Sequence, residues 1–371
     1  MKITFPHMGN TYIAVKALLD DIGADYVIPP LSSKRSLEIG TKYAPEMACL
    51  PLKINIGNYI EAYEKGADTI LTAGGRGPCR FGYYCEMSRE ILCDNGYDME
   101  VIVLEPPEGD IVNFIGKIKK LAGSLNIYRI LNVIKNTTLV AKRVDELERL
   151  AFKIRPRELI KGSTDRIYEN FQRTVVDVKG SQEILKLVEN TKNQLLKLEI
   201  DKDFMPLKVG IVGEIYTTID SYTSFNIDSI LGNMGVEVYR ANTISGWIIE
   251  HILKAVVPFT KDKGYAEAAK PYLGTMIGGH AQETIGNTVI YAQNGFDGII
   301  QIYPLTCMPE IVAESILPAV ERDYNIPILT LIIDEMTGEA GYMTRIEAFV
   351  DLLNKRRERG EVVKNLALSG N

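Results

Sequence analysis

Short apolar runs alternate with helix-patterned stretches in two separate parts of the chain, residues 1–107 and residues 206–333. In the first part the expected strands are residues 2–5, 26–28, 69–72 and 100–104, and the expected helices are residues 11–22, 51–65 and 84–95. In the second part the expected strands are residues 207–212, 298–303 and 328–333, again with helical stretches between them. Strands separated by helices of this length form βαβ units, so each part predicts a parallel sheet with helices on both faces.

The segment between these two parts carries almost no strand signal. Lys, Glu, Leu and Ile recur there at helical spacing, as in residues 140–152 and 182–198. We therefore predict an α/β protein with two Rossmann-like parallel-sheet domains, residues 1–109 and 206–371, joined by an intervening helical segment of residues 110–205.

The composition argues against several classes of protein. Basic side chains number 42 and acidic side chains 48, a formal net charge of −6, whereas nucleic-acid-binding proteins usually carry a basic excess. No stretch approaches the roughly 18 uninterrupted apolar residues of a membrane helix, and the N-terminus lacks the apolar core of a signal peptide. We therefore expect a cytoplasmic protein with reduced thiols, and with neither nucleic acid nor a membrane as a partner.

The two α/β parts share a local pattern around a cysteine. Gly66 precedes the run 67–72 and Cys79 follows it, 13 residues after the glycine. Gly295 precedes the run 296–301 in the same way, and Cys307 lies 12 residues after that glycine. In both places the pattern indicates a glycine-capped helix end, a strand and then a loop with a cysteine, which favours a duplicated, pseudo-symmetric architecture.

The five cysteines are odd in number and too few for a disulfide scaffold: Cys49, Cys79, Cys85, Cys93 and Cys307. Cys79 and Cys307 each follow a predicted strand, at the sheet edge where open α/β folds bind ligands. A proline two residues after Cys49 and after Cys307 is typical of the first turn of a helix. We therefore expect both thiols near the positive end of a helix dipole, where the pKa of a thiol is lowered.

Three thiolates from two sheets suit an iron–sulfur cluster with one iron left open for exchange or for a substrate. Gly77 and its neighbouring glycines would let backbone N–H groups approach the cluster beside Cys79. Cys85 is a candidate fourth ligand, or a ligand of a neighbouring iron, whereas Cys93 lies on an apolar helical face and is expected to fill the core. Any single cysteine has the alternative of being a buried apolar residue. Zinc is the alternative metal, although the paired C-x₂-C spacing that it favours is absent.

Histidine is scarce, and one histidine lies at an apparent helix start. His280 and Glu283 in the sequence GGHAQE could supply proton transfer or hydrogen bonds to a cluster, which makes them the candidate catalytic residues. The alternative is a helix cap with a solvent-facing histidine. No G-x-x-x-x-G-K-[ST] motif occurs in the chain, so we do not expect a P-loop ATPase.

Four motifs together resemble one protein family. They are MACLPLK at 47–53, GRGPCRFG at 75–82, GGHAQE at 278–283 and YPLTCMP at 303–309. In their order they resemble the 2-hydroxyacyl-CoA dehydratase D-component superfamily, and most closely its branch related to CoA-protein activase-type and double-cubane-cluster proteins. The resemblance covers nearly the whole chain. It implies two α/β domains with an iron–sulfur cluster held between them by Cys49, Cys79 and Cys307.

The resemblance also implies a function. An ATP-hydrolysing iron–sulfur activator would deliver low-potential electrons, and the chain would reduce or dehydrate a small substrate as one component of a homo- or hetero-oligomer. The cluster would be of the 4Fe–4S type. A double-cubane cluster is an alternative for which five cysteines are few, and no CoA-binding element is recognisable. Two other functions stay open: a non-catalytic iron–sulfur or metal-binding carrier, and a metal-free solute- or nucleotide-binding protein with buried cysteines.

Overall fold

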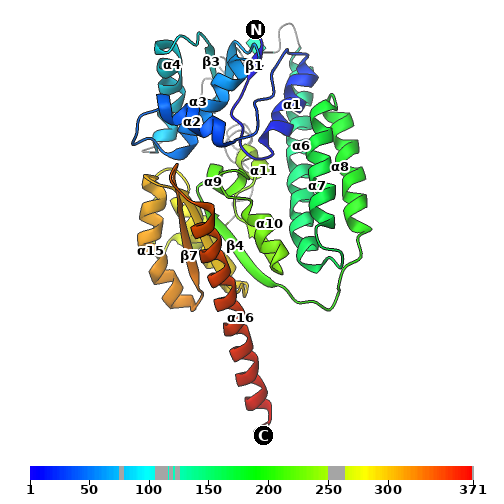
Figure 1. Cartoon of the computed structure of the whole chain (residues 1–371), viewed down its shortest axis with the longest axis vertical. Coiled ribbons are helices and arrows are strands. Elements are labelled where there is room, and N and C mark those ends of the chain that lie inside the picture. The colour runs from blue at the N-terminus through cyan, green and yellow to red at the C-terminus, as the bar shows by residue number, and fades with distance from the viewer. Residues whose placement is uncertain (75–78, 105–115, 117–119, 122–125, 250–263, 370–371) are drawn as a thin grey trace.

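Seven parallel strands form two sheets in the computed structural model, which describes all residues except 75–78, 105–115, 117–119, 122–125, 250–263 and 370–371 (Figure 1). The N-terminal sheet has the order β1 (Ile3–Thr4), β2 (Thr69–Ala73), β3 (Glu100–Leu104). The C-terminal sheet has the order β5 (Val236–Arg240), β4 (Leu207–Gly213), β6 (Gly298–Pro304), β7 (Ile328–Ile333). With helices between the strands, this confirms the predicted fold class of two Rossmann-like parallel-sheet domains.

The observed strands differ from the expected ones in two places. Residues 26–28 form no strand; Tyr26 makes only an isolated bridge to Ile3. Strand β5 was not predicted, because Glu237 and Arg240 interrupt its apolar run. Both charged side chains are nevertheless buried, since Glu237 forms an ion pair with Arg157 and Arg240 forms ion pairs of its own.

Helix α3 (Leu50–Tyr63) is buried on all sides. Because Cys49 directly precedes it, the packing of α3 determines where Cys49 lies. Every residue from Leu50 to Ala62 is buried, as expected of a helix without a polar face. Helix α2 (Lys34–Tyr43) packs directly on its backbone: a Cβ atom at Gly57 would lie 1.9 Å from the carbonyl oxygen of Ser36. Only glycine allows two helix backbones to approach so closely.

The helical segment is a layer of three helices that lie side by side (Figure 1): α6 (Ile127–Ile154), α7 (Ser163–Asp177) and α8 (Ser181–Leu196). They pack together with α1 (Thr11–Ile22). One hydrophobic cluster contains Phe5 of the N-terminal domain, Val144 of α6 and Phe171 of α7. The helical segment therefore shares its core with the N-terminal sheet.

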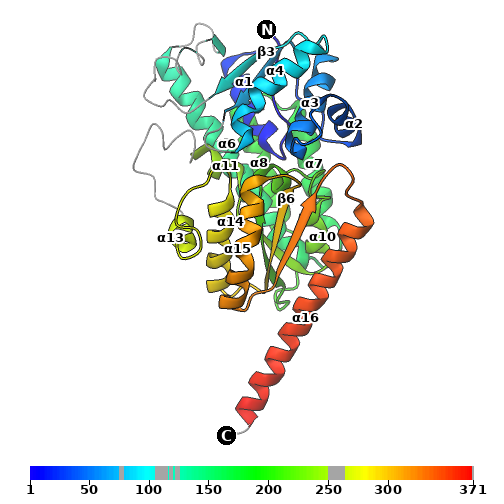
Figure 2. The ribbon, with the colours of Figure 1, turned by 90° about the vertical axis from the view of Figure 1, so that its left-hand side faces the viewer.

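Helices cover both faces of the C-terminal sheet (Figure 2). Helices α14 (Ala281–Gln293) and α15 (Met308–Tyr324) lie together on one face with the short α13 (Tyr265–Ala269). Helices α10 (Ile227–Asn233) and α16 (Glu339–Ser369) pack on the other face. The short helices α9 (Ile215–Ile219) and α11 (Ile244–Ile248) follow β4 and β5.

The two α/β domains meet in a buried interface. Leu50 and Ile54 of α3 belong to the same hydrophobic cluster as β4 and β6. The buried Lys53 Nζ forms an ion pair with Glu335 after β7, with a distance of 2.6 Å. Among the described residues no helix is long and apolar enough to cross a bilayer.

Substitution of Gly57 by alanine tests the close packing that positions α3. The new methyl group would meet the Ser36 carbonyl, so we expect Gly57→Ala to lower the free energy of unfolding by about 1–3 kcal/mol or more. Chemical denaturation measures this change. Gly341→Ala is the control, because a Cβ atom at Gly341 in α16 meets nothing within 4 Å; an equal loss in both variants would contradict the packing argument.

Candidate cysteine site

Three of the five cysteines are the residues that begin helices. Cys49 is the N-cap of α3 and Cys307 the N-cap of α15, each with the predicted proline in the first turn. Cys79 is the N-cap of a short 3₁₀ helix, Arg80–Tyr83, that leads into α4 (Tyr84–Asp94). All three have extended backbone conformations. All five cysteines lie within the described ranges, and none of them forms a disulfide.

The predicted repetition of the cysteine loops is present in the structure. Strands β2 and β6 are both interior strands of their sheets. Gly66 before β2 and Gly295 before β6 adopt left-handed backbone angles, with φ of 88° and 71°. Cys79 and Cys307 follow the carboxyl ends of these strands, at the edge where open α/β sheets bind ligands.

One guanidinium group joins the three cysteine loops. Arg80, which follows Cys79, donates a hydrogen bond to the carbonyl oxygen of Met47 (2.9 Å) and another to that of Thr306 (2.8 Å). Met47 lies two residues before Cys49, and Thr306 immediately precedes Cys307. The hydroxyl group of Thr306 also donates to the Met47 carbonyl (3.3 Å). These contacts connect loops from both α/β domains.

Thr306 has a backbone conformation that threonine rarely adopts. Its φ of 70° lies in the left-handed region, which is disfavoured for a β-branched residue. Arg80 binds both its carbonyl oxygen and its hydroxyl group (3.0 Å), so the same guanidinium holds this strained turn. Strain of this kind concentrates at functional sites.

The three thiols have raised pKa values, which corrects the expectation of a lowered pKa. Burial is the largest cause in each case: it raises the pKa of Cys49 to about 12 and also raises those of Cys79 and Cys307. The carboxylate of Glu214 raises all three further. A backbone N–H at the helix start lowers the pKa of Cys307, as predicted, and another lowers that of Cys79, but burial outweighs both. For Cys49 the group that lowers the pKa most is the Tyr84 hydroxyl.

Glu214 brings a negative charge to the three thiols from the C-terminal sheet. It directly follows β4, and its carboxylate accepts hydrogen bonds from the backbone N–H groups of Tyr216 and Thr217, both at 2.9 Å. In the sequence, Glu214 is recognisable only as the residue that follows a strand. No sequence signal distinguishes a functional carboxylate at this position from one that caps the next helix. A carboxylate beside buried thiols favours a cationic occupant of the site.

Glu310 is a second buried carboxyl group beside the site. It lies in the first turn of α15, is fully buried, and accepts hydrogen bonds from Thr284 (3.0 Å) and Gln301 (3.0 Å). Burial raises its pKa to about 7, against the opposing effect of these hydrogen bonds. Its backbone N–H lowers the pKa of Cys307. Sequence reasoning missed Glu310, because a glutamate in the first turn of a helix is usually an ordinary exposed residue.

The predicted pair His280 and Glu283 lies close to the cysteines. His280 is the N-cap of α14, and Glu283 lies in its first turn and raises the pKa of Glu310. A Cβ atom at Gly279 would lie 2.5 Å from the side chain of Pro309 and 3.8 Å from the Cβ of Cys79. The GGH loop therefore packs directly against the cysteine loops. The proton-transfer role of the pair remains a prediction.

The remaining predicted residues lie elsewhere. Cys85 is on the first turn of α4, donates to the carbonyl oxygen of Gly82 (3.8 Å) and lines a separate pocket. Cys93 is exposed, so its prediction as a core residue is wrong: α4 buries the face that carries Ser88 and Leu92, and Cys93 lies beside that face. Gly77 lies outside the described residues.

Buried thiols are the potential metal ligands of this site. Within the described part of the chain, no group of three His, Cys, Asp or Glu side chains could hold one metal ion. Soft, buried thiol donors suit iron–sulfur chemistry. No protein-family model matches the chain, and no curated protein matches it.

Removal of the Arg80 guanidinium tests whether it holds the loops together. A hydrogen bond from a charged donor contributes about 1.5–3 kcal/mol. Because Arg80 is exposed, we expect the lower end of this range. Arg80→Gln should therefore speed amide exchange of residues 47–49 and 306–308 by about tenfold. Hydrogen–deuterium exchange with mass spectrometry measures this. Arg89→Gln, which breaks only the local ion pair with Glu86, should leave these amides unchanged; unchanged exchange in both variants would contradict the cross-link.

The pKa of Glu310 predicts a pH dependence of stability. Its pKa is raised from 4.5 in the unfolded chain to about 7, so its protonated form favours folding. The stabilisation by this carboxyl group is fully present below pH 4.5 and is lost as the pH rises to about 7. The free energy of unfolding should fall by about 3 kcal/mol over this range. In Glu310→Gln this loss should disappear from the pH profile of the unfolding free energy. Glu347→Gln, on the exposed side of α16, is the control; identical profiles for wild type and Glu310→Gln would refute the assignment.

Proposed function

We propose that this chain is an iron–sulfur protein of the 2-hydroxyacyl-CoA dehydratase type. Cys49, Cys79 and Cys307 hold the cluster between the two α/β domains, and an ATP-dependent activator supplies low-potential electrons for the reduction or dehydration of a small substrate. The observation that carries the proposal is the gathering of three helix-starting cysteines from both domains around Arg80.

The electrostatics of the site favour metal binding. Thiolates beside Glu214 would concentrate negative charge in a buried place, and the raised pKa values show that the thiols keep their protons without a compensating cation. A metal cluster would displace these protons and balance the thiolate charge. When bound, the cluster would supply one-electron chemistry at low potential.

Each of the three sulfur atoms has a hydrogen-bonding neighbour among the described residues. Tyr84 contacts Cys49 through its hydroxyl group, and the backbone N–H of Phe81 contacts Cys79. The backbone N–H of Glu310 contacts Cys307. Hydrogen bonds to ligand sulfurs stabilise the electron-rich state and so adjust a cluster's reduction potential.

The protonated carboxyl group of Glu310 beside the site favours an enzyme over the alternative of an electron relay. Reduction and dehydration both consume or release protons, and Glu310 holds one near neutral pH. His280 and Glu283 lie at the start of the neighbouring helix α14. A simple relay has no need of such groups.

Exposed apolar side chains beside the cysteines suit a protein partner. Met47, Leu305 and Met308, which flank Cys49 and Cys307 in the sequence, are 67%, 48% and 38% exposed. Exposed large apolar residues that cluster are typical of interaction sites. An activator bound over them would stand next to the cysteine loops, as electron transfer requires.

Cluster loading of cysteine variants tests the proposed function. After anaerobic reconstitution with iron and sulfide, we expect wild type to bind iron and sulfide and to give an iron–sulfur EPR signal on reduction. Cys79→Ala and Cys307→Ala should retain only trace iron, because each removes one of three ligands. Cys93→Ala is the matched control and should load normally. Trace iron in wild type would refute the proposal.

A further inference from the structure

The two α/β domains repeat the same order of strands as well as the same cysteine loop. In the C-terminal sheet β4 lies between β5 on one side and β6 on the other, with β7 outside β6. In the N-terminal sheet Ile3 of β1 pairs with β2 on one side and makes the parallel bridge to Tyr26 on the other, with β3 outside β2. The segment at Tyr26 therefore corresponds to β5, and β1, β2 and β3 correspond to β4, β6 and β7.

The helix before each cysteine loop corresponds in the same way. Helix α3 has 14 residues, leads into β2 and has Cys49 as its N-cap. Helix α14 has 13 residues, leads into β6 and has His280 as its N-cap. Gly66 follows Cys49 by 17 residues, and Gly295 follows His280 by 15. His280 is therefore the counterpart of Cys49 in the C-terminal domain.

Contacts of the described residues place the start of α14 against the cysteine loops. A Cβ atom at Gly279, directly before His280, would lie 3.8 Å from the Cβ of Cys79. One turn into α14, the hydroxyl group of Thr284 donates a hydrogen bond to the carboxyl group of Glu310 in the first turn of α15 (3.0 Å). The N-cap of α14 therefore lies between the Cys79 loop and the start of α15.

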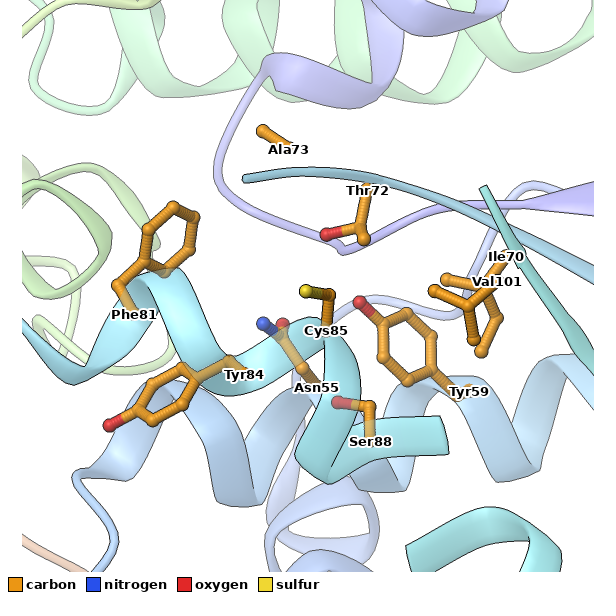
Figure 3. Close-up of a pocket in the computed structure, with 10 residues that line it drawn as sticks. All are labelled: Asn55, Tyr59, Ile70, Thr72, Ala73, Phe81, Tyr84, Cys85, Ser88 and Val101. Carbon is orange, nitrogen blue, oxygen red and sulfur yellow. The ribbon is translucent and has the colours of Figure 1, made fainter. Parts of the chain in front are cut away.

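Cys85, the fourth-ligand candidate from the sequence, is turned away from this place. In Figure 3 its thiol points toward Asn55 and Tyr59 in a small pocket, whereas the hydroxyl group of Tyr84 points away from that pocket. The same hydroxyl group contacts the sulfur of Cys49. The ring of Tyr84 therefore separates Cys85 from Cys49.

A neutral fourth ligand suits the charge of the site better than a fourth thiolate. Three thiolates and the carboxylate of Glu214, which raises the pKa of all three thiols, would already concentrate negative charge in a buried place. Imidazole is a common ligand of iron and binds as a neutral group, so it adds no further charge. Replacement of thiolate ligands by histidine also raises the reduction potential of an iron–sulfur cluster.

We propose that His280 is the fourth protein ligand of the cluster, the counterpart of Cys49, and that one of its ring nitrogens binds the iron to which no cysteine is bound. This inference rests on the proposed function, because it needs the cluster. A ligated imidazole keeps only its second nitrogen for hydrogen bonding. Glu310 then remains the proton-holding group of the site.

Pulsed EPR of the anaerobically reconstituted and reduced protein tests this ligand. A nitrogen bonded to iron couples strongly to the unpaired electron of a reduced cluster, and labelling with ¹⁵N-histidine identifies it as a histidine nitrogen. We expect wild type to show this coupling and His280→Gln to lose it. Gln282→Met is the matched control, because it removes a side-chain nitrogen from the same turn of α14 and should keep the coupling.

The variant His280→Cys tests the assignment in the opposite direction. It puts a thiolate at the position that corresponds to Cys49, so we expect the cluster to load and the histidine coupling to disappear. Because an anionic ligand replaces a neutral one, the midpoint potential should fall. A redox titration followed by EPR measures this shift; an unchanged or raised potential would contradict the assignment.

The failure of this inference is distinguishable from the failure of the proposed function. A wild-type cluster without histidine coupling, or coupling that persists in His280→Gln, overturns the ligand and leaves the proposed function intact. Wild type that binds no cluster refutes both. The comparison of labelled with unlabelled wild type stands even if a variant does not load.

Discussion

The contacts of Arg80 are the constraint on which the cysteine site depends. Its planar guanidinium, which follows Cys79, reaches the carbonyl oxygens of Met47 and Thr306 together and so connects three loops from two separate sheets. A lysine in its place would carry a compact ammonium group instead of a planar fork of donors, and it could not bind both carbonyl oxygens in the same way. The strained turn at Thr306 shows that the fold accepts a local cost to bring Cys307 to this place.

Burial gives the site its chemical character. It keeps the thiols of Cys49, Cys79 and Cys307 protonated and holds a proton on Glu310 near neutral pH. A cationic cluster would remove the protons from the thiols. The proton of Glu310, in the first turn of α15 after the N-cap Cys307, would then lie beside the metal centre. Helix starts contribute hydrogen bonds to the sulfurs, but they do not decide the thiol pKa.

The sequence predicted the architecture because apolar periodicity determines which segments become strands and helices. It missed β5, whose charges Glu237 and Arg240 are acceptable only beside partners from other segments. It identified Cys49 and Cys307 as helix starts from the prolines that follow them, and it placed Cys79 and Cys307 in loops that follow strands. Arg80 and Glu310 could not be identified in the same way, because their roles depend on contacts between segments far apart in the chain.

The central claim is that the three loops joined by Arg80 hold one iron–sulfur cluster. X-ray absorption at the iron K-edge of the anaerobically reconstituted protein tests it most directly. We predict iron surrounded by sulfur, with a short iron–iron scattering path that only a polynuclear cluster produces. Iron surrounded by oxygen and nitrogen alone, with no iron–iron scattering, would contradict the claim.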